Sequence, residues 1–404
     1  MPPSGRSGSV VDRTATVTAG RAATDRSVMP SPQLVALAHR LIANIGADTT
    51  DLGDHVYRGD GSIFTDPERF EAEREAFFRR TPQVVGWGGE VAEPGDVLAR
   101  VVAGVPVLVT RDGDGALRAF LNACTHRGMG LCDGADNTRR LTCGYHGWTY
   151  DLAGRLVGLP HRERFPGLDT EALGLQPLPV DEQAGLVVVG LRPDVELAGF
   201  LEPLAADTAW MGYGHYRGAA QVTLRKRANW KLMVDVNIEA YHVPTLHRET
   251  LLPFLADHCA VDRWGPHTRL VVPFKGLEAL ADRPEAEWPD RLDAVMVTTL
   301  FPSTVLVDHM QGGSMLQIAP GDHVGETTVT ITEARPGPVD DAVRTECEET
   351  MAINLSILDA EDFPAAESCQ RGFEAGSRPV IGGVGESLIG HWHETWDAAL
   401  AELG

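Results

Sequence analysis

The stretch Cys124–Trp148, CTHRGMGLCDGADNTRRLTCGYHGW, decides what kind of fold this chain can have. It contains two short loops that each offer one thiolate and one imidazole: Cys124 with His126, and Cys143 with His146. Thiolate and imidazole are ligands of zinc and of iron, so two such pairs predict a metal centre. Structural zinc usually takes C-x2-C or H-x3-H spacing, and neither loop has that spacing.

A [2Fe-2S] cluster in which two histidines replace two cysteines on one iron fits these loops better. Such a cluster takes one cysteine and one histidine from each of two loops, which clamp it from either side. The pattern C-x-H-x16-C-x2-H offers this arrangement. Cys132 lies outside the pattern, and we interpret it as a thiol without a ligand role.

The composition limits the class of protein. The 404 residues include 35 basic and 57 acidic side chains, for a formal net charge of -22. This charge argues against nucleic acid as a partner, because phosphates demand a basic face. No run of eighteen apolar residues predicts a membrane span. Six scattered cysteines do not form a disulfide framework, and we expect a cytoplasmic protein.

The chain divides into four segments of different texture. Residues 1–32 are rich in Ser, Thr, Arg, Pro, Ala and Gly and predict a disordered tail. Residues 33–83 have helical patterns, and we expect these helices to pack on the C-terminal domain. Short β-rich runs over residues 84–197 predict a small antiparallel β domain that contains both loops. Residues 198–404 combine strand-like runs with a long amphipathic helix, which predicts an α+β domain.

The C-terminal domain carries a second constellation, NWKLMVDVNIEAYHVPTLHRET, in which Pro244 stands between His242 and His247. Because proline cannot continue a helix, we expect His242 to close one helix and His247 to be turned back toward it. Two imidazoles brought together leave room for a carboxylate, as in the 2-His-1-carboxylate triad of non-haem iron oxygenases. The spacing alone leaves open a pair of unrelated histidines near a helix end.

The two constellations together resemble the motifs of a known protein family. CTHRG followed by CGYHGW resembles the Rieske iron–sulfur domain, and NWK…E-A-Y-H-x4-H is similar to the catalytic signature of Rieske ring-hydroxylating oxygenase α subunits. Both stand in the family's order, and the resemblance covers roughly Pro82 to Trp396. It implies a helix-grip α+β domain with a mononuclear iron beside the Rieske domain. It also implies that Cys124, His126, Cys143 and His146 hold the [2Fe-2S] cluster.

The resemblance places the third iron ligand, an Asp, ahead of a short E-x-x-Q stretch, and EDFPAAESCQRG matches with Asp362. His242, His247 and Asp362 are therefore the implied iron ligands, with Asp359 and Glu361 as rivals for the carboxylate. An Asp just before a helix start is also a common helix cap, which is the alternative without a metal.

In the family a carboxylate links the iron of one subunit to the Rieske histidine of its neighbour, and this position falls on Glu239. Three residues before His242, Glu239 is expected on the same helix face, within reach of the free ring nitrogen. The alternative is a solvated acidic face shared with Asp235. Most ring hydroxylators have Asp here, and Glu is similar to the branch acting on choline, carnitine and betaines. Cation recognition needs an aromatic cage. The aromatic residues available for one are Tyr241, Trp264, Phe274, Trp288 and Phe301.

The resemblance implies a terminal oxygenase that uses O2 to hydroxylate an aromatic ring or an N-methyl or quaternary ammonium substrate. No G-x-G-x-x-G follows a strand, so a separate NAD(P)H-dependent flavin/iron–sulfur reductase is expected, with or without a ferredoxin. Electron transfer between subunits implies a homotrimer or a multiple of it. The rivals are a Rieske-type electron-transfer protein without oxygenase activity and a zinc protein.

Overall fold

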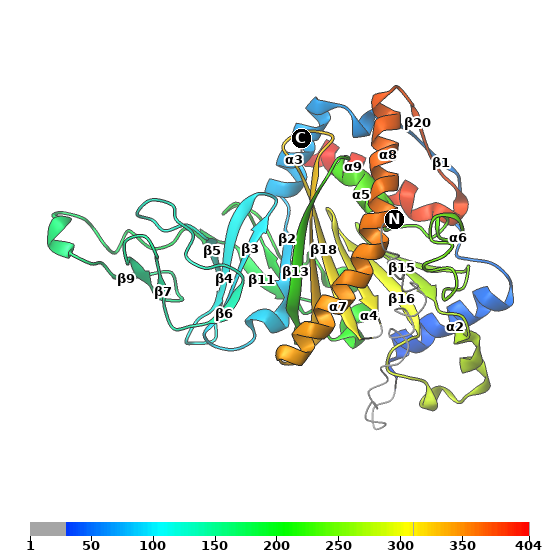
Figure 1. Ribbon diagram of the computed structural model, residues 1–404, viewed down its shortest axis with the longest axis horizontal. Helices are drawn as coiled ribbons and strands as arrows, with labels where there is room; N and C mark the ends of the chain where they lie inside the picture. The colour runs from blue at the N-terminus through cyan, green and yellow to red at the C-terminus, as the bar shows by residue number, and fades with distance from the viewer. Residues whose placement is uncertain (1–29, 310, 404) are drawn as a thin grey trace, which may run out of the picture.

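The computed structural model describes residues 30–309 and 311–403. The tail expected over residues 1–32 therefore lies outside the described residues up to residue 29. A seven-stranded sheet with its helices forms a body, and a narrow arm of smaller sheets extends from it (Figure 1). This mixed architecture confirms the expected α+β class. None of the helices in the described ranges has the length and apolar character of a membrane span.

The arm consists of three antiparallel sheets. A five-stranded sheet has the order β10-β5-β4-β3-β6, a second sheet has the order β11-β12-β2, and the outermost has the order β7-β8-β9. Its strands are β2 (Gln83–Trp87), β3 (Asp96–Val102), β4 (Val105–Arg111), β5 (Leu117–Leu121), β6 (Ala135–Asn137), β7 (Leu141–Thr142), β8 (Thr149–Tyr150), β9 (Leu156–Gly158), β10 (Pro177–Leu178), β11 (Val180–Gln183) and β12 (Leu186–Val189). The two Cys/His loops belong to this arm, as the sequence predicted.

The body is built on an antiparallel sheet with the order β13-β19-β18-β17-β16-β15-β14. Because successive side chains of a strand point to opposite faces, each face has its own core. On β17, Val305 packs in one core with Trp230, whereas Leu306 packs in the other with Met315. The strands are β13 (Tyr216–Lys226), β14 (Ala260–Trp264), β15 (His267–Pro273), β16 (Ala294–Leu300), β17 (Thr304–His309), β18 (Gly312–Pro320) and β19 (Thr327–Pro336).

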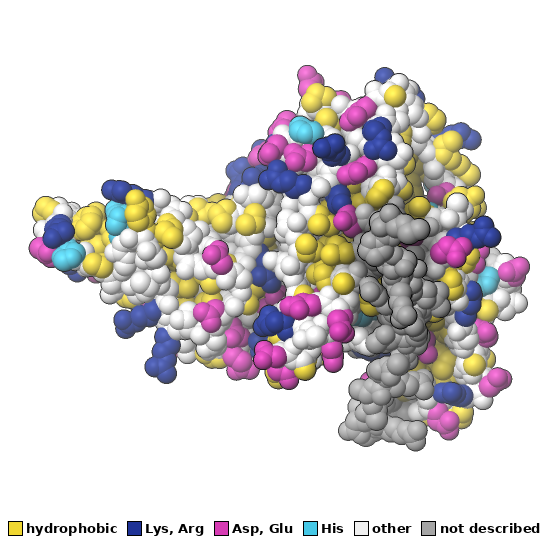
Figure 2. Space-filling model, viewed as in Figure 1, with side chains coloured by type: hydrophobic (Ala, Val, Ile, Leu, Met, Phe, Trp, Pro, Cys, Tyr) yellow, Lys and Arg dark blue, Asp and Glu magenta, His cyan; other side chains and the backbone are white. Residues whose placement is uncertain are grey.

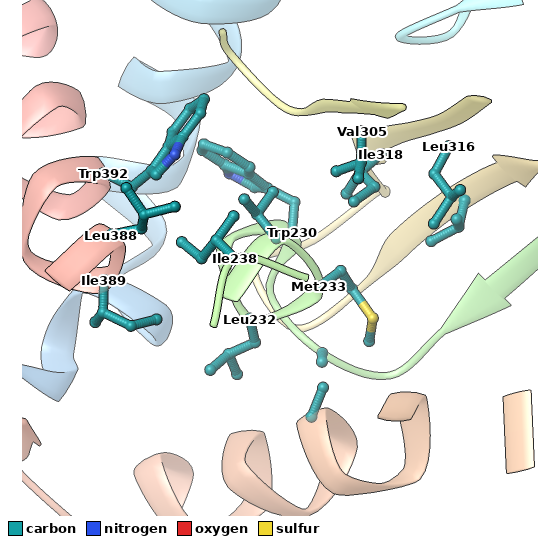
Figure 3. Packing of buried hydrophobic residues seen from close by; sticks show 14 of the residues in the cluster. Trp230, Leu232, Met233, Ile238, Val305, Leu316, Ile318, Leu388, Ile389 and Trp392 are labelled. Carbon is teal, nitrogen blue, oxygen red and sulfur yellow. The ribbon is translucent and has the colours of Figure 1, made fainter. Parts of the chain in front are cut away.

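Helices cover the face that carries Val305, which we call the helix face. Trp230 and Met233 lie between Leu316 of the sheet and Trp392 of the C-terminal helix (Figure 3). α7 runs along β13 and β19 (Figure 1). A sheet holding helices on one face is the helix-grip arrangement that was expected. The helices that contribute to this core are α3 (Pro67–Arg79), α5 (Trp230–Asp235), α6 (Val243–Leu246), α7 (Asp341–Ile357), α8 (Phe363–Glu374) and α9 (Ser387–Leu403).

The opposite face joins the arm to the body. α2 (Pro32–Gly46) and α4 (Glu202–Thr208) pack there. Trp87 of β2 belongs to the same core, where its ring lies 5.2 Å from that of Tyr213 and 5.1 Å from that of Tyr216. A pairing that the sequence analysis missed links β1 (Tyr57–Asp60) with β20 (Pro379–Gly382). This pair joins residues 57–60 to residues 379–382, next to α9.

Candidate metal centres

The two Cys/His loops have the same backbone geometry. In each, the amide of the glycine four residues after the cysteine donates to the cysteine carbonyl, at 2.7 Å for Gly128 and Cys124 and at 2.9 Å for Gly147 and Cys143. The cysteine amide in turn donates to the carbonyl five positions on, at 2.8 Å in both loops. Gly128 and Gly147 have φ angles of 76° and 74°, a left-handed conformation that glycine adopts without steric cost. Local sequence therefore accounts for both turns.

The loops bring two histidines and two thiols together. The rings of His126 and His146 lie 4.6 Å apart between centroids, and His126 stacks on Trp148 at the same distance. Cys124 and Cys143 are both buried in one cluster. His126 Nδ1 is buried and has no hydrogen-bond partner in the part of the chain that the structure describes. A buried ring nitrogen without a partner fits a metal ligand.

The surroundings of these residues suit a cluster. Burial, followed by the positive charges nearby, lowers the pKa of His126, which keeps the imidazole neutral near pH 7. The hydroxyl of Tyr150 lies 3.2 Å from Cys124 Sγ and accepts the Thr125 amide at 3.1 Å. Burial, with the hydrogen bond to Cys124, raises the pKa of Tyr150 to about 12. The phenol thus keeps its proton, and both Cys124 Sγ and the Thr125 hydroxyl, at 2.9 Å, are within hydrogen-bonding distance of it.

In the body, one expectation about the chain trace is wrong. NWK…AYH is not one helix: α5 ends at Asp235, and residues 236–242 are not helical. Pro244 lies in the first turn of the short helix α6, which His242 precedes and His247 follows. Proline is favoured in a first turn because its missing N–H would have no intrahelical partner there. The proline therefore begins a helix rather than breaking one, and the two histidines stand at the two ends of a single turn.

Asp362 meets both histidines. His247 Nε2 lies 3.0 Å from Asp362 Oδ1, and His242 Nε2 lies 3.6 Å from the same oxygen. One possible ligand atom from each of the three residues lies within 4.8 Å of the other two. The structure thus brings together the three residues that the sequence singled out for iron.

A π-helical turn presents Asp362 to the histidines. α7 ends at Ile357 and continues through η8 (Leu358–Asp362) into α8. π-turns are rare and occur often at functional sites. Asp362 makes no side-chain hydrogen bond to the start of α8, so helix capping does not account for it.

The E-x-x-Q stretch after Asp362 anchors α8 rather than joining the site. Glu367 Oε1 accepts the Arg227 amide at 2.9 Å, and Gln370 Oε1 accepts the Asn229 amide at 3.0 Å. Both amides precede α5. These bonds tie α8 to the segment that leads to the two histidines, and so fix the position of Asp362 relative to them.

The two rival carboxylates have other partners. Asp359 pairs with Lys226. Glu361 Oε2 lies 2.6 Å from His247 Nδ1 and accepts the Thr250 hydroxyl at 2.7 Å. The contact between Glu361 and the far edge of the His247 ring was not foreseen from the sequence. Its only signal there was a second carboxylate adjacent to the predicted ligand.

Glu239 contacts His242, although no helix carries the two residues. One Glu239 oxygen bonds His242 Nδ1, and the other accepts the His242 amide at 3.2 Å. The expected shared helix face is wrong, but the expected contact is present. The alternative of an acidic face shared with Asp235 is also wrong, because Asp235 bonds His393 at 3.1 Å. The side chains of Glu239 and His242 are 12% and 21% exposed, and that of Tyr241 beside them is 77% exposed.

The site carries an excess of negative charge. Glu239, Glu361 and Asp362 surround the two imidazoles, and among the described residues these three carboxylates pair with His and with no Lys or Arg. Burial lowers the pKa of His247, but the hydrogen bonds to Asp362 and Glu361 outweigh burial and raise it. Two nitrogens and a carboxylate oxygen in such a field fit a divalent metal ion.

The aromatic residues considered for a cation cage lie in different parts of the body. Tyr241 is exposed. Trp264 and Trp288 pack in the core of the opposite sheet face. Phe274 and Phe301 pack in the helix-face core, where Phe301 stacks against a tryptophan of α9. These five residues therefore do not form one cage.

Two family models match the chain. The model described as "Rieske [2Fe-2S] domain" matches residues 81–176, and the model described as "Ring hydroxylating alpha subunit (catalytic domain)" matches residues 214–402. The two lie in the order that the sequence predicted. Their matched ranges are not domain limits, so the limits drawn above at residues 84–197 and 198–404 stay predictions.

Similarity to curated proteins covers about half of each. The chain is 33% identical over 208 residues to the carnitine monooxygenase oxygenase subunit of Acinetobacter pittii (strain PHEA-2), which is 50% of this chain and 54% of that protein. It is 31% identical over 218 residues to the glycine betaine monooxygenase oxygenase subunit of Pseudomonas aeruginosa (strain UCBPP-PA14), 52% of this chain and 49% of that protein. It is also 33% identical over 222 residues to the chlorobenzene dioxygenase subunit alpha of Cupriavidus sp. (strain PS12), with the same coverage of 52% and 49%.

Two solved structures share the fold over nearly their whole length. The quaternary ammonium Rieske monooxygenase CntA, crystallised with an inhibitor, superposes with a TM-score of 0.70 at 22% identity, covering 92% of this chain and 99% of that one. Naphthalene 1,2-dioxygenase from Rhodococcus sp., bound to indole, superposes with a TM-score of 0.69 at 20% identity, covering 92% and 98%. At this identity the likeness shows the fold alone.

Proposed function

Because the chain belongs to the Rieske non-haem iron oxygenases, as an oxygenase α subunit, we propose that it is the terminal oxygenase component of a Rieske system. In this role it takes electrons from a separate reductase and uses O2 to hydroxylate a small organic substrate. The observation that carries the proposal is the convergence of His242, His247 and Asp362 in the same chain as the two Cys/His loops. The alternative function, electron transfer without oxygenase activity, does not require this triad.

The geometry supports two sets of ligands. When bound, the cluster supplies electrons one at a time and the mononuclear iron supplies the centre at which O2 is activated. Thiolates and imidazoles suit the cluster, and two imidazoles with one carboxylate suit Fe(II) with open positions. The proposed cluster ligands are Cys124, His126, Cys143 and His146. The proposed iron ligands are His242, His247 and Asp362.

The carboxylates around the triad orient its imidazoles. An ionised carboxylate only accepts hydrogen bonds, so a glutamate at Nδ1 holds the ring proton there and leaves the Nε2 lone pair for a metal. Glu239 occupies this place for His242, and Glu361 occupies it for His247. The packed helix-face core behind α5 and α8 keeps water away from the buried side of the site.

The proposal includes electron transfer between subunits, with Glu239 as the bridge. In one chain the outer strands of the arm and α6 lie at opposite ends of the molecule (Figure 1). A route through one chain is therefore long. A neighbouring arm docked beside Tyr241 shortens it, because Glu239 is bonded to His242 and lies two residues before the exposed Tyr241.

Exposed hydrophobic side chains support a head-to-tail contact between subunits. Figure 2 shows such side chains along the upper edge of the arm. Those on the arm near the two loops are Met129, Tyr145, Val157 and Leu168. Those on the body near β1, β20 and α6 are Leu52, Val56, Tyr241 and Ile381. Exposed apolar side chains at both ends favour contact of an arm with the next body, and repetition of that contact closes a ring. We propose a homotrimer or a multiple of it.

Two observations point to different substrate classes. Glu rather than Asp at position 239 and the names of the first two relatives favour an N-methyl or quaternary ammonium substrate. The similarity to chlorobenzene dioxygenase favours an aromatic ring. Monooxygenation of a C–H bond consumes one O2, two electrons and two protons and yields one hydroxyl group and one water. On an N-methyl carbon the hydroxylated product loses formaldehyde.

The electrons come from NAD(P)H through a flavin/iron–sulfur reductase, with or without a ferredoxin. Reduced nicotinamide is a coenzyme of the cytoplasm, and we place the protein there. The role of the reductase is testable by comparing reduction of the cluster with NAD(P)H alone and with an added reductase.

The test of this function is single-turnover O2 uptake by the chemically reduced, iron-loaded protein. The panel pairs monocyclic and bicyclic aromatics with choline, carnitine and betaines, and products are identified by mass with 18O2. Hydroxylated rings assign the aromatic class, and formaldehyde or trimethylamine assigns the quaternary ammonium class. The matched control is Asp362→Ala, which keeps the cluster and removes an iron ligand. Labelled product from this control at the rate of the unmodified protein would show that the triad is not the site.

A further inference from the structure

From the geometry we propose that Glu361 is a positioning residue of the mononuclear site. It holds His247 in the orientation and the tautomer that bind the metal. The inference rests on the metal site proposed above and assigns a role to a residue that is neither a ligand nor the bridge between subunits.

The carboxylates of Glu361 and Asp362, which are adjacent in the sequence, contact opposite edges of the His247 imidazole. Glu361 Oε2 lies 2.6 Å from His247 Nδ1, and Asp362 Oδ1 lies 3.0 Å from His247 Nε2. Because an ionised carboxylate accepts only, the bond at Nδ1 places the ring proton on that nitrogen. With a metal ion bound, Nε2 would offer its lone pair on the side of Asp362, where His242 Nε2 also points. Removing Glu361 frees the ring to rotate or to change tautomer.

Glu361 is itself held in place. The Thr250 hydroxyl donates to the same Oε2 atom at 2.7 Å, and the Thr250 amide donates to the His247 carbonyl at 3.2 Å. His247, Thr250 and Glu361 thus form a closed set of hydrogen bonds. The Glu361 side chain is only 24% exposed, so solvent screens this set weakly. A supported carboxylate of this kind raises the basicity of the imidazole and strengthens its bond to a metal.

The π-helical turn separates three carboxylates that the sequence places within four positions. Asp359 reaches Lys226, Glu361 reaches one edge of His247, and Asp362 reaches the other edge. Side chains of successive residues diverge by about 100° in an α-helix, which directs neighbours to different partners. Here both neighbours bind one ring. The π-turn therefore positions both Glu361, which orients the His247 imidazole, and Asp362, the proposed metal ligand.

The two histidines differ in where their glutamates lie. Glu239, the partner of His242, is close to the exposed Tyr241, at the face proposed to meet another subunit. Glu361, the partner of His247, is also held by the Thr250 hydroxyl, away from Tyr241 in the sequence. We therefore expect loss of Glu361 to weaken metal binding in the isolated chain, and loss of Glu239 to act mainly on electron transfer.

The experiment compares metal binding by the unmodified protein and by Glu361→Gln, each with its cluster intact and its mononuclear metal removed. Both are dialysed against buffered Fe(II) or Co(II) without oxygen, and bound metal is measured by mass spectrometry. We expect Glu361→Gln to bind the ion about 10–100-fold more weakly. Thr250→Val, which removes only the support of Glu361, should weaken binding less. The electron paramagnetic resonance spectrum of bound Co(II), recorded with the cluster oxidised and silent, should change in Glu361→Gln.

The matched control is Asp359→Asn, which alters a carboxylate of the same turn that contacts no imidazole. It should keep the metal affinity and the Co(II) spectrum of the unmodified protein, and the thermal unfolding of all variants is compared. Equal affinity in Glu361→Gln and the unmodified protein would overturn the inference alone. Equal loss in Asp359→Asn would also overturn it, because the turn rather than the imidazole contact would then matter. If the unmodified protein binds no ion at this site, the proposed function fails instead.

Discussion

The two candidate centres of this chain are built in opposite ways. The four ligands of the arm lie within one stretch, Cys124–His146, and two turns with the same hydrogen bonds present them. The triad of the body takes His242 and His247 from one segment and Asp362 from another, more distant one. A local site needs short-range hydrogen bonds and two left-handed glycines. A distant site needs a whole sheet, with α7 and α8 held against it, to set the positions of its ligands.

The two centres also differ in charge. Among the described residues, no carboxylate forms a hydrogen bond or ion pair with a cysteine or histidine of the two arm loops. In the body, Glu239, Glu361 and Asp362 surround two imidazoles. Neutral hydrogen bonding, as from Tyr150, suits a centre that changes its charge by one electron. A field of carboxylates suits a centre that must hold a divalent ion.

The largest expected effect is the complete loss of metal from one centre while the other centre keeps its metal. Asp362→Ala should empty the mononuclear site and abolish product formation, while the cluster keeps its absorbance. Cys143→Ser should do the reverse, with loss of the cluster and retention of a divalent ion at the triad. Iron content and visible absorbance measured on both variants test this independence. Full iron retention in Asp362→Ala would move the carboxylate ligand to another residue of the π-turn.

Glu239→Gln tests the link between the two centres. With iron in excess both metals should stay bound, because neither centre loses a ligand, and coupled turnover with a reductase should fall by about 10–100-fold. Rapid mixing of the reduced protein with O2 and substrate should show slow oxidation of the cluster. Asp235→Asn, which alters a carboxylate bonded to His393 instead, serves as the control. Unchanged coupled turnover in Glu239→Gln would remove the bridging role.

A smaller effect compares the two loops of the arm with each other. Alanine in the left-handed conformation costs about 1–2 kcal/mol, so both Gly128→Ala and Gly147→Ala should weaken cluster retention. A methyl group at Gly147 would also meet Pro160 Cγ at 3.1 Å, whereas the space at Gly128 is open. Gly147→Ala should therefore lose its cluster at a lower temperature or denaturant concentration. Equal losses would show that Pro160 moves aside.

The smallest expected effect concerns the reduction potential of the cluster. The Tyr150 hydroxyl lies against Cys124 Sγ, and a hydrogen bond to sulfur favours the reduced, more negative state. A hydrogen bond that is about 1 kcal/mol stronger to the reduced than to the oxidised cluster corresponds to roughly 40 mV for one electron, so Tyr150→Phe should lower the potential by about that amount. Potentiometric titration measures it. Tyr145→Phe, on an exposed ring of the second loop, should leave the potential unchanged.

Local sequence patterns predicted the structure correctly where only one interpretation of the pattern was sterically possible. The β-rich runs before residue 197 became strands, and the helical patterns within residues 33–83 became α2 and α3. Pro244 misled the prediction because proline is compatible with both the end of one helix and the first turn of the next. The helix expected to run to His242 ends at Asp235, and Ile238 of the non-helical segment that follows is buried in the helix-face core.

The sequence by itself singled out the residues that we propose to bear the chemistry. The two Cys/His pairs, the two histidines around Pro244 and a carboxylate before E-x-x-Q carry their ligand types and spacing in one dimension. Only the tertiary structure decided how neighbouring, chemically equivalent groups divide their roles. Glu361 and Asp362 are adjacent carboxylates, yet one meets Nδ1 and the other Nε2 of His247. That assignment depends on the phase of a π-turn and on where α8 is anchored, and such angles are set by packing across the whole sheet.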